Sequence, residues 1–360
     1  MSYKIKVISR GTVYRNKHSK FGYAAWPSIA KADNGDLLVV ASGMRTAHVD
    51  PFGKVILMRS RDMGETWSNP MIALDTPLDD RDAGILNLGG GNYIVTSFNN
   101  TREIQKNYIG LPWTGAVNDA ARIRMIYGYL DCITDEEEEK YYSSSFNISR
   151  NDANSFEEFV PIPITSPHGP MKTPDGRIIW VGKTHHGYLE LGEDILCYEI
   201  HDDLSYEKIG TVAKGDDFNE RLVEPHCIAV DDKHFISHIR IQNGCFTVWQ
   251  SESFDGGYTW TEPVELGVDG SPPHLLMCRE GRLISTYGKR SEPFGISAMI
   301  SEDSGKTWET DIPLAWDGID SDLGYPCSIE LGDGSIFTVY YAKLAAGEVP
   351  GIQYIRWSFE

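Results

Sequence analysis

An eight-residue pattern, Ser-x-Asp-x-Gly-x-Thr-Trp, occurs three times in this chain of 360 residues. The copies begin at Ser60, Ser253 and Ser301, and a weaker copy begins at Ser149 and keeps an aromatic residue, Phe156, in place of Trp. In a tight turn the Asp carboxylate caps backbone N–H groups, Gly adopts a positive φ and Trp fills the space beneath. Because internal repeats determine the fold of a chain, the pattern predicts an array of similar β-hairpin units.

A second repeat consists of a short polar turn followed by an apolar strand. It occurs six times, with central turn residues Gly35, Gly91, Gly176, Lys233, Gly281 and Gly334. Turn residues between β-branched and aromatic runs indicate hairpins. Copies of the first pattern follow the first, fourth and fifth of these turns, so each unit holds one hairpin and then another. The two repeats together predict an all-β, six-bladed β-propeller of four-stranded antiparallel blades.

Residues 1–360 are expected to form this propeller as a single domain. The longest interval between turns contains extra sequence, approximately residues 100–145, which predicts an inserted segment between the second and third blades. Its acidic run, residues 135–139, is typical of a solvated loop or helix end. The N-terminal strand, residues 5–13, is expected to complete the last blade and close the ring.

The formal net charge of −19 and a pI near 4.9 argue against a nucleic-acid or anionic-membrane partner. No apolar run is long enough for a membrane span. The start of the chain lacks a signal peptide, which predicts a cytoplasmic protein or a mature secreted form whose leader has been removed. The six cysteines show no metal-binding spacing and are expected to be reduced, mostly buried thiols. We expect neither a metal nor another cofactor, and no sequence signal indicates an oligomeric state.

Innermost strands of a propeller line its axis, so residues at equivalent offsets should meet there. The residues seven to nine positions before the six turns are Trp26, Asp82, His168, Glu224, His274 and Tyr325. The residues seven to ten positions after the turns are Arg45, Asn100, His186, Arg240, Arg290 and Lys343. A plain β core would place apolar residues here, so these polar side chains predict a binding site rather than an arbitrary hydrated channel.

These features resemble the sialidase superfamily over nearly the whole chain apart from the insertion. The eight-residue pattern matches the Asp-box repeat of that family, which also occurs in propellers without sialidase activity. More specific are Glu224 followed 16 residues later by Arg240, Arg290 in the fifth blade, and Tyr325 before the last hairpin. Arg45 and Asp50 match the arginine and the acid that follow the first hairpin of the family.

The resemblance implies a catalytic trio of Tyr325 as nucleophile, Glu224 as its base and Asp50 as the acid. A neutral Tyr avoids the repulsion between a carboxylate nucleophile and an acidic sugar. Each residue also has a structural alternative: a buried aromatic for Tyr325, an ion pair with Arg240 for Glu224, and a turn cap for Asp50. His48 is a second candidate for the acid, since histidine titrates near neutral pH.

Substrate contacts are predicted from Trp26, Arg45, Asp82, His168, His186, Arg240, His274 and Arg290. Arg240 and Arg290 are suited to a carboxylate, because a guanidinium binds it bidentately. Asp82 is expected to contact a hydroxyl or N-acyl group. The sialidase family has a first clamp arginine where this chain has Trp26, which leaves two clamp arginines unless another basic residue takes that role. An indole there predicts contact with an apolar sugar face.

The predicted function is that of an exo-glycosidase acting on a terminal α-linked sialic or related acidic sugar, with a glycan or sialoside as its partner. Two alternatives stay open. The many histidines could serve a propeller hydrolase or lyase for another sugar, such as rhamnose or a uronic acid. A carbohydrate-binding propeller without turnover would not require Asp50, Glu224 and Tyr325 to face one cavity.

Overall fold

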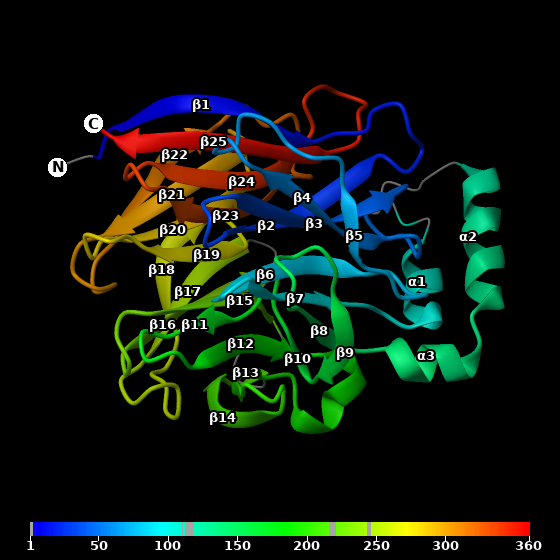
Figure 1. Cartoon of the computed structure of the whole chain (residues 1–360), viewed down its shortest axis with the longest axis horizontal. Coiled ribbons are helices and arrows are strands. Elements are labelled where there is room, and N and C mark those ends of the chain that lie inside the picture. Colours follow the sequence, from blue (N-terminus) through cyan, green and yellow to red (C-terminus); the bar gives the residue numbers. More distant parts are fainter. Residues whose placement is uncertain (1–2, 110, 112–118, 216–220, 243–245) are drawn as a thin grey trace.

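The computed structural model describes residues 3–109, 111, 119–215, 221–242 and 246–360. These residues form six antiparallel sheets, which are the six predicted blades of a β-propeller (Figure 1). We number the blades I to VI along the chain.

The first three blades use the chain up to residue 213. Blade I contains β2 (Tyr23–Lys31), β3 (Leu37–Arg45), β4 (Lys54–Ser60) and β5 (Met71–Leu74). Blade II contains β6 (Arg81–Gly89), β7 (Asn92–Phe98), β8 (Ser144–Ser149) and β9 (Glu157–Ile162). Blade III contains β10 (Ile164–Thr165), β11 (Met171–Lys172), β12 (Ile178–Thr184), β13 (Ile195–Ile200) and β14 (Tyr206–Ala213). Both β10 and β11 pair with β12, so the innermost strand of blade III is interrupted.

The last three blades are more regular. Blade IV contains β15 (Leu222–Ala229), β16 (Phe235–Gln242), β17 (Phe246–Ser253) and β18 (Val264–Asp269). Blade V contains β19 (Pro273–Met277), β20 (Leu283–Lys289), β21 (Gly295–Ser301) and β22 (Glu309–Ala315). Blade VI contains β23 (Gly324–Glu330), β24 (Ile336–Ala342), β25 (Gly351–Phe359) and β1 (Ile5–Tyr14).

The N-terminal strand closes the ring, as predicted. β1 pairs antiparallel with β25 from Ile5, opposite Phe359, to Tyr14, opposite Ile352 (Figure 1). The outer strand of blade VI therefore comes from one end of the chain and its other three strands come from the other end. This pairing covers the edge of β25, which would otherwise be open.

The Asp boxes form the turns between the third and fourth strands of blades I, IV and V. In the first box the Asp62 carboxylate accepts the Thr66 N–H at 2.9 Å, and Ser60 Oγ accepts the Gly64 N–H at 2.8 Å. Trp67 donates its indole N–H to the Gly64 carbonyl oxygen. Gly64 has a φ of 92°, where a side chain would be strained and would also meet Phe337. The repeated sequence thus fixes the same turn each time.

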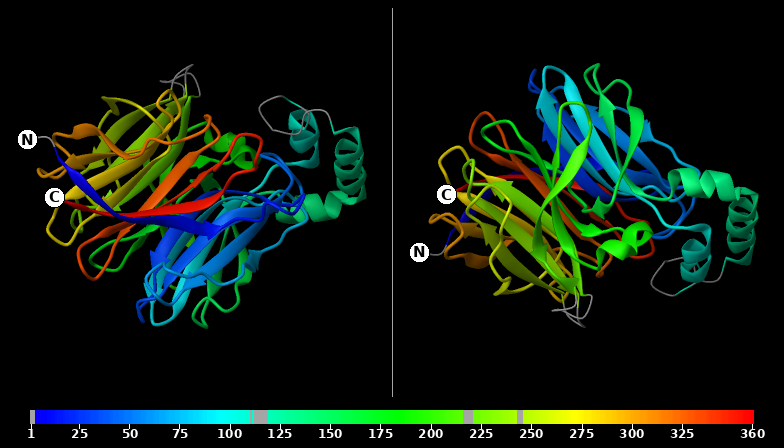
Figure 2. Two further views of the ribbon diagram at one scale, coloured as in Figure 1. Left: turned by 90° about the horizontal axis from the view of Figure 1, so that it is seen from above. Right: turned by 90° about the horizontal axis from the view of Figure 1, so that it is seen from below.

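The insertion lies within blade II and not between the second and third blades. Its helices α1 (Arg102–Tyr108), α2 (Ala120–Cys132) and α3 (Asp135–Tyr141) come between β7 and β8. The weaker Asp box starting at Ser149 forms the turn from β8 to β9, so the extra residues had to precede it. Figure 2 shows the three helices together at one side of the propeller, opposite both chain termini.

Apolar contacts hold this helical segment to the propeller. Ile126 and Leu130 of α2 are fully buried and pack with Leu78, while the Tyr129 ring lies 4.9 Å from that of Phe52, tilted by 47°. Trp113 lies outside the described residues. No helix that the structure describes is long and apolar enough to cross a membrane.

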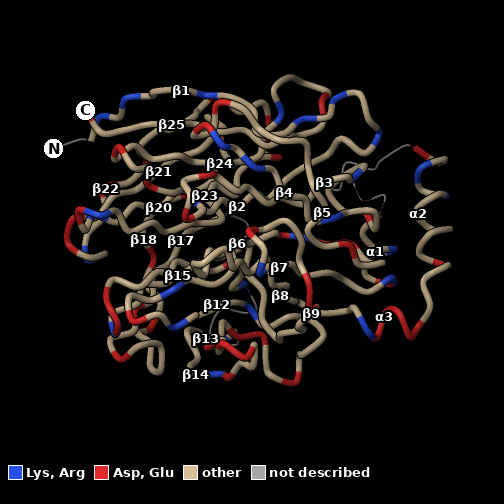
Figure 3. Tube along the Cα trace, in the orientation of Figure 1, with Lys and Arg blue, Asp and Glu red and all other residues tan. Residues whose placement is uncertain are grey.

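The acidic run and the described cysteines agree with the expectations of a helix-end acidic segment and mostly buried thiols. Acidic residues occur along many segments of the chain, and α3 carries the acidic run (Figure 3). Four of the cysteines are buried free thiols: Cys197, Cys227, Cys278 and Cys327. Cys132 is exposed, and Cys245 lies outside the described residues.

A β-bulge repeats in the innermost strands and aims side chains at the axis. Trp26, Asp82, Glu224 and Tyr325 have φ values of 54°, 49°, 49° and 49°. Each lies where the pairing of its innermost strand with the next strand shifts register. A bulge re-aims a side chain, and a non-glycine residue at positive φ marks a position that the surrounding structure holds under strain. Four such positions meet at one end of the axis.

Candidate active site

Three of the four bulge residues, Asp82, Glu224 and Tyr325, border a cavity of about 900 Å³, which we call the axial cavity. Its lining includes Asp82, Glu224, Arg240, Arg290 and Tyr325, drawn from blades II, IV, V and VI. Cavities of this size with a few convergent charged groups are typical of small-molecule sites.

Tyr325 and Glu224 form a close pair at the wall of the cavity. The Tyr325 hydroxyl donates to Glu224 Oε1 at 2.5 Å. Burial, followed by the negative charge of Glu224, holds the pKa of Tyr325 well above its ordinary value, so the phenol is neutral. Arg240 donates to Glu224 Oε2 and lies 3.4 Å from the Tyr325 hydroxyl. A carboxylate that receives the proton of a neutral phenol can make its oxygen nucleophilic.

Arg240 and Arg290 both have spare donors. Arg240 Nε and Arg290 Nε are buried without a hydrogen-bond partner. Arg290 makes no ion pair within the described part of the chain, and its Nη2 donates to the Tyr341 hydroxyl at 3.4 Å. Its guanidinium carbon lies 5.5 Å from the ring centre of Tyr325. Unsatisfied guanidinium groups in a cavity favour an anionic ligand.

Arg81 is a third arginine of the cavity, which the sequence reasoning missed. It is the first residue of β6 and lines the cavity next to Asp82. The signal was present in the run Asp79-Asp80-Arg81-Asp82, where only the last residue was selected. Its guanidinium carbon lies 4.3 Å from the ring centre of Trp26.

Asp82 is a buried acid of the cavity. Its Oδ1 is buried without a hydrogen-bond partner. Burial raises the pKa of Asp82 to about 7, with Arg81 opposing this and Glu224 adding to it. Arg45 and Arg240 also face Asp82 and lower its pKa. Asp82 therefore retains a proton at pH values where an exposed carboxyl has lost it.

A second polar group lies across the cavity, where His48, Tyr23 and Asp322 meet. The Tyr23 hydroxyl donates to Asp322 Oδ1 at 3.1 Å and lies 3.0 Å from His48 Nδ1. Burial lowers the pKa of His48 to about 4, so its ring is neutral at pH 7. Burial opposes ionisation of Asp322, but its bond to His48 and the charge of Lys343 lower its pKa to about 2. Lys343 also lines the cavity and pairs with Asp320 at 2.8 Å.

Asp50 does not line the axial cavity. Its carboxylate accepts N–H groups from Thr46 at 2.6 Å and Phe52 at 2.9 Å, and the residue is 0% exposed. Asp50 is thus the turn cap that was its structural alternative, and it holds the loop that brings Thr46 and His48 to the cavity.

Arg45 and Trp26 lie beneath the cavity surface and not on it. Arg45 is 0% exposed and pairs with Asp79 at 2.6 Å. Trp26 is 1% exposed, and neither residue lines the cavity, so the apolar contact predicted between sugar and indole does not fit this structure. Its bulge aims the indole into the layer below the cavity floor, where Tyr23, His48 and Tyr325 surround it.

His168 and His274 pack below the cavity with His226. The rings of His226 and His274 stack at 4.3 Å, and His168 lies edge-on to both. Burial holds the pKa of all three well below the ordinary value. His186 is an exposed residue at the start of the 3₁₀ segment His186–Leu191, away from the cavity lining. The structure therefore does not place His168, His186 or His274 in the lining of the axial cavity.

The histidine layer has the wrong chemistry for a metal. His226 Nδ1 accepts the Leu275 N–H at 2.9 Å, and His274 Nδ1 accepts the Ser328 N–H at 3.3 Å. A neutral ring that accepts at Nδ1 carries its proton on Nε2, which leaves no lone pair for a metal there. Among the residues that the structure describes, no group of His, Cys, Asp or Glu is arranged to hold a metal ion.

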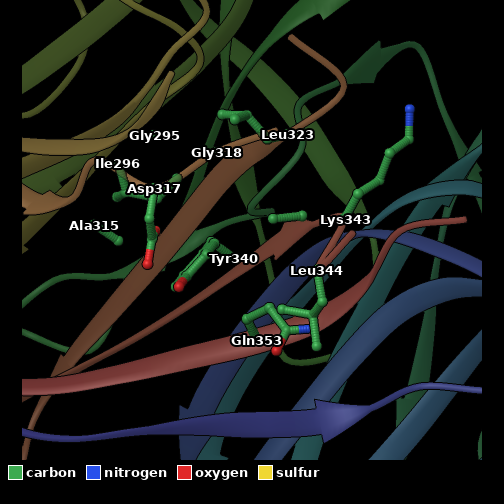
Figure 4. Close-up of a pocket in the computed structure, with 11 residues that line it drawn as sticks. Gly295, Ile296, Ala315, Asp317, Gly318, Leu323, Tyr340, Lys343, Leu344 and Gln353 are labelled. Carbon is green, nitrogen blue, oxygen red and sulfur yellow. The ribbon is translucent and has the colours of Figure 1, made fainter. Parts of the chain in front are cut away.

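A second cavity, of about 130 Å³, lies between blades V and VI (Figure 4). Ile296, Leu323, Tyr340 and Gln353 line it, and the segment between β22 and β23 separates it from the axial cavity. Of the residues predicted to meet at the axis, Lys343 lines this cavity as well as the axial cavity.

Comparisons with known proteins agree with this architecture. The profile of the BNR repeat-like domain matches residues 129–338. No curated protein matches the chain. Among solved structures, a Dyadobacter fermentans protein of unknown function has a TM-score of 0.76 and 20% identity, with 99% of each chain covered.

Two sialidases have the same fold at lower similarity. The NanB sialidase of Streptococcus pneumoniae has a TM-score of 0.66 and 14% identity over 97% of this chain and 70% of its own. The intramolecular trans-sialidase of Ruminococcus gnavus has a TM-score of 0.66 and 13% identity, with 98% of each chain covered. At these identities the likeness concerns the fold. With the profile match covering more than half of its length, the chain belongs to the BNR repeat-like domain family and is a sialidase-like six-bladed propeller.

Proposed function

We propose that this protein is an exo-glycosidase of the sialidase type that hydrolyses a terminal α-linked sialic or related acidic sugar. The observation that carries the proposal is the 2.5 Å hydrogen bond from the Tyr325 hydroxyl to Glu224, at the wall of a cavity that also presents Arg240 and Arg290. A binding module has no need of a phenol paired with a base. The sialidases among the solved structures of the same fold support the choice of sugar class.

In the first step the Tyr325 oxygen attacks the anomeric carbon while its proton passes to Glu224. The bond from the anomeric carbon to the leaving oxygen breaks, and that oxygen takes a proton from an acid of the cavity. In the second step water attacks the anomeric carbon and releases the Tyr325 oxygen, which recovers its proton from Glu224. The deprotonated acid takes the proton of the water, so both groups return to their starting state.

Asp82 is our candidate for that acid. Asp50 is occupied as a turn cap, and His48 has a pKa lowered to about 4, so neither offers a proton to the cavity at pH 7. Asp82 has a pKa raised to about 7 and an unpartnered Oδ1. General acids work best when their pKa lies near the operating pH.

The arginines explain why the sugar would be acidic. Arg240 and Arg290 present unpaired Nε donors, and burial makes a charge-assisted bond stronger than it is in water. A carboxylate on the anomeric carbon would lie between them and would offset their charge.

A histidine-driven hydrolase or lyase is less well supported. Three of the histidines that favoured it pack on one another below the cavity. His48 alone among the described histidines lines the cavity, and its Nδ1 lies against Tyr23.

A panel of aryl glycosides tests the proposal. We expect release of the aryl group from the α-glycoside of sialic acid or of its deaminated relative, and none from rhamnoside or glucuronide. Turnover of the rhamnoside or the glucuronide alone would instead support the alternative hydrolase or lyase. Binding of sialic acid without turnover of any substrate would identify a carbohydrate-binding propeller.

A further inference from the structure

Arg81 enters the axial cavity from blade II and rests on an aromatic platform. Its guanidinium carbon is 4.3 Å from the ring centre of Trp26 and 5.9 Å from that of Phe98. Its Nη1 donates to the His48 carbonyl oxygen at 2.7 Å and to Asp79 Oδ2 at 3.4 Å. Within the described residues, no protein acceptor is recorded for its Nε or Nη2. One edge of the guanidinium is anchored and the other is available to a ligand.

The Asp79 carboxylate does not neutralise Arg81 by itself. Arg45 pairs with the same carboxylate at 2.6 Å and is completely buried. Two guanidinium groups thus share the Asp79 carboxylate, and Asp82 is the other acid whose charge acts most on Arg81. Both guanidinium groups also lie near Trp26, Arg45 at 4.8 Å and Arg81 at 4.3 Å.

Trp26 is held in place before any ligand arrives. It occupies a bulge with a φ of 54°, is 1% exposed, and packs edge-on to His48 at 4.9 Å and to Tyr325 at 6.3 Å. An indole is the best aromatic partner for a cation, and the contact strengthens when water is excluded. A platform of this kind fixes a long side chain in advance, which removes an entropic cost of binding.

We propose that Trp26 is a positioning residue that holds Arg81 as a third carboxylate-binding arginine beside Arg240 and Arg290. Blade II then supplies the third guanidinium. Blade I supplies Trp26, which supports Arg81 and does not itself contact the sugar. The ligand class is a sugar bearing a carboxylate. The inference rests on the proposed function in that the ligand is an acidic sugar, but it does not require turnover.

The arrangement also explains why an arginine would not suit position 26. An arginine there would lie among Arg45, Arg81 and a single shared carboxylate, and like charges at close range in a buried site are repulsive. Trp26→Arg should therefore damage the site in the presence of Arg81.

A double-mutant cycle on Trp26 and Arg81 tests the proposal. The probes are sialic acid and glucuronic acid, each with its methyl ester, with dissociation constants measured by calorimetry. We expect Arg81→Met to weaken binding of at least one acid about tenfold to a hundredfold and to change ester binding little. Trp26→Leu should weaken the same acid about threefold to tenfold, and Trp26→Phe should restore most of the loss.

The decisive comparison is Trp26→Leu in the Arg81→Met background. A positioning role predicts no further loss of acid binding there, because the arginine that Trp26 supports is already gone. A purely structural role predicts the same loss in both backgrounds, for acid and ester alike, and would overturn the proposal. Acid binding that is insensitive to Arg81→Met would also overturn it. Arg177→Met removes an arginine that pairs with Glu199 outside the cavity and serves as the matched control.

Failure of the proposed function gives a different result. If the wild type binds glucuronic acid but neither binds nor hydrolyses sialic acid derivatives, the sialidase assignment fails while the cycle can still be measured with glucuronic acid. If Trp26→Leu does not fold, Trp26→Phe and Arg81→Met complete the cycle, and a loss in the Phe variant that persists without Arg81 contradicts the positioning role.

Discussion

In the proposed mechanism, Tyr325 and Glu224 divide the work of a nucleophile between two residues. Burial keeps the Tyr325 phenol protonated, and the 2.5 Å bond to Glu224 gives that proton a defined acceptor. A neutral nucleophile can approach an anomeric carbon that carries a carboxylate without charge repulsion. The raised pKa of Tyr325 is thus compatible with catalysis, because the proton leaves only as the new bond forms.

Tyr325→Phe is expected to abolish turnover and to preserve the fold and ligand binding. The substitution removes one hydroxyl and retains the ring that packs against Trp26 and Tyr341. The loss in kcat should amount to several orders of magnitude, with little change in the dissociation constant of a sialic acid analogue. Steady-state kinetics with an aryl sialoside measures the first quantity and calorimetry the second. A variant that retains more than about a tenth of the wild-type rate would exclude Tyr325 as the nucleophile.

Asp82→Asn is expected to identify Asp82 as the acid, because the loss of activity should depend on the leaving group of the substrate. A protonated carboxyl is needed when the leaving oxygen is basic, and much less when the leaving group is a stable phenolate. The variant should lose activity on a sialyl-sugar while retaining much of it on a nitrophenyl sialoside. Wild-type kcat/KM on the sialyl-sugar should fall as the pH rises through about 7, since Asp82 is protonated below its raised pKa, and the variant should lack this limb.

Asp50→Asn and His48→Gln are the matched comparisons for this experiment. Both residues belong to one loop, and each was a candidate acid on sequence grounds. If either variant shows the leaving-group dependence and Asp82→Asn does not, the acid lies on that loop. Loss of activity on both substrates in Asp50→Asn would instead reflect loss of the turn that holds Thr46 and His48.

At the scale of elements, the innermost strands share a motif that is visible in the sequence once the bulge is known. Five of the six blades have Pro at one equivalent position, as Pro27, Pro167, Pro225, Pro273 and Pro326, and in blades I, IV and VI this Pro directly follows the bulge residue. Blade II has Ala83 at this position. In blade order, the residues that precede this position are Trp26, Asp82, Ser166, Glu224, Pro272 and Tyr325. The residues that follow it are Ser28, Gly84, His168, His226, His274 and Cys327.

This alignment explains which site residues could be predicted and which could not. In blades I, II, IV and VI, counting back from the turns reached the bulge residue. In blades III and V it selected His168 and His274, which correspond to His226 and not to Glu224. In blade III the distance from the turn to the equivalent position, Ser166, is ten residues rather than nine, and β10 and β11 interrupt the innermost strand. In blade V a count of nine gives Pro272, and the polar residue two positions later was selected instead.

Other parts of the site depend on tertiary contacts that no local pattern encodes. The two repeats predicted six blades, their strands and the closing strand, because turn chemistry is local. Whether Asp50 faces the cavity or caps its own turn depends on the loop around it. The role of Arg81 depends on Trp26, which is 55 residues away in sequence and belongs to another blade.

Ala83→Pro is expected to be tolerated, because it gives blade II the residue that the other five blades have at this position. Ala83 lies in the register gap between the pairs Arg81–Phe98 and Gly84–Thr96. We expect the free energy of unfolding to change by no more than about 1 kcal/mol, in either direction. Ile85→Pro, in the paired part of the same strand opposite Val95, is the control and should be clearly more destabilising. Equal destabilisation by the two variants in denaturant titrations would show that the bulge of blade II differs from the others.

At the scale of the whole molecule, blade VI links the cavity to the strand that closes the ring. Blade VI supplies Tyr325 from its innermost strand, and the outermost strand of the same blade is β1. The Thr12 hydroxyl of β1 donates to Gln353 Oε1 of β25 at 2.8 Å. The Arg10 guanidinium of β1 donates to the Leu314 carbonyl oxygen of blade V at 2.8 Å. The first strand therefore joins the two ends of the chain and also braces blade V.

Deletion of residues 1–14 is expected to lower the melting temperature by several degrees and to reduce activity, while a synthetic peptide of residues 3–16 should restore both. Without β1, the edge of β25 would present unpaired N–H and C=O groups, and an exposed edge promotes aggregation. The added peptide can pair with that edge in the register that runs from Ile5, opposite Phe359, to Tyr14, opposite Ile352. A peptide with Pro in place of Thr12, which lies opposite Gln353, should rescue less well because it lacks one N–H donor and a side-chain partner. Calorimetry and aryl sialoside kinetics on the truncated protein, with either peptide, measure these effects. If the truncated chain kept the wild-type melting temperature and rate, closure by β1 would contribute little to the site. The other five blades and the remaining three strands of blade VI would then hold Tyr325 against Glu224 without β1.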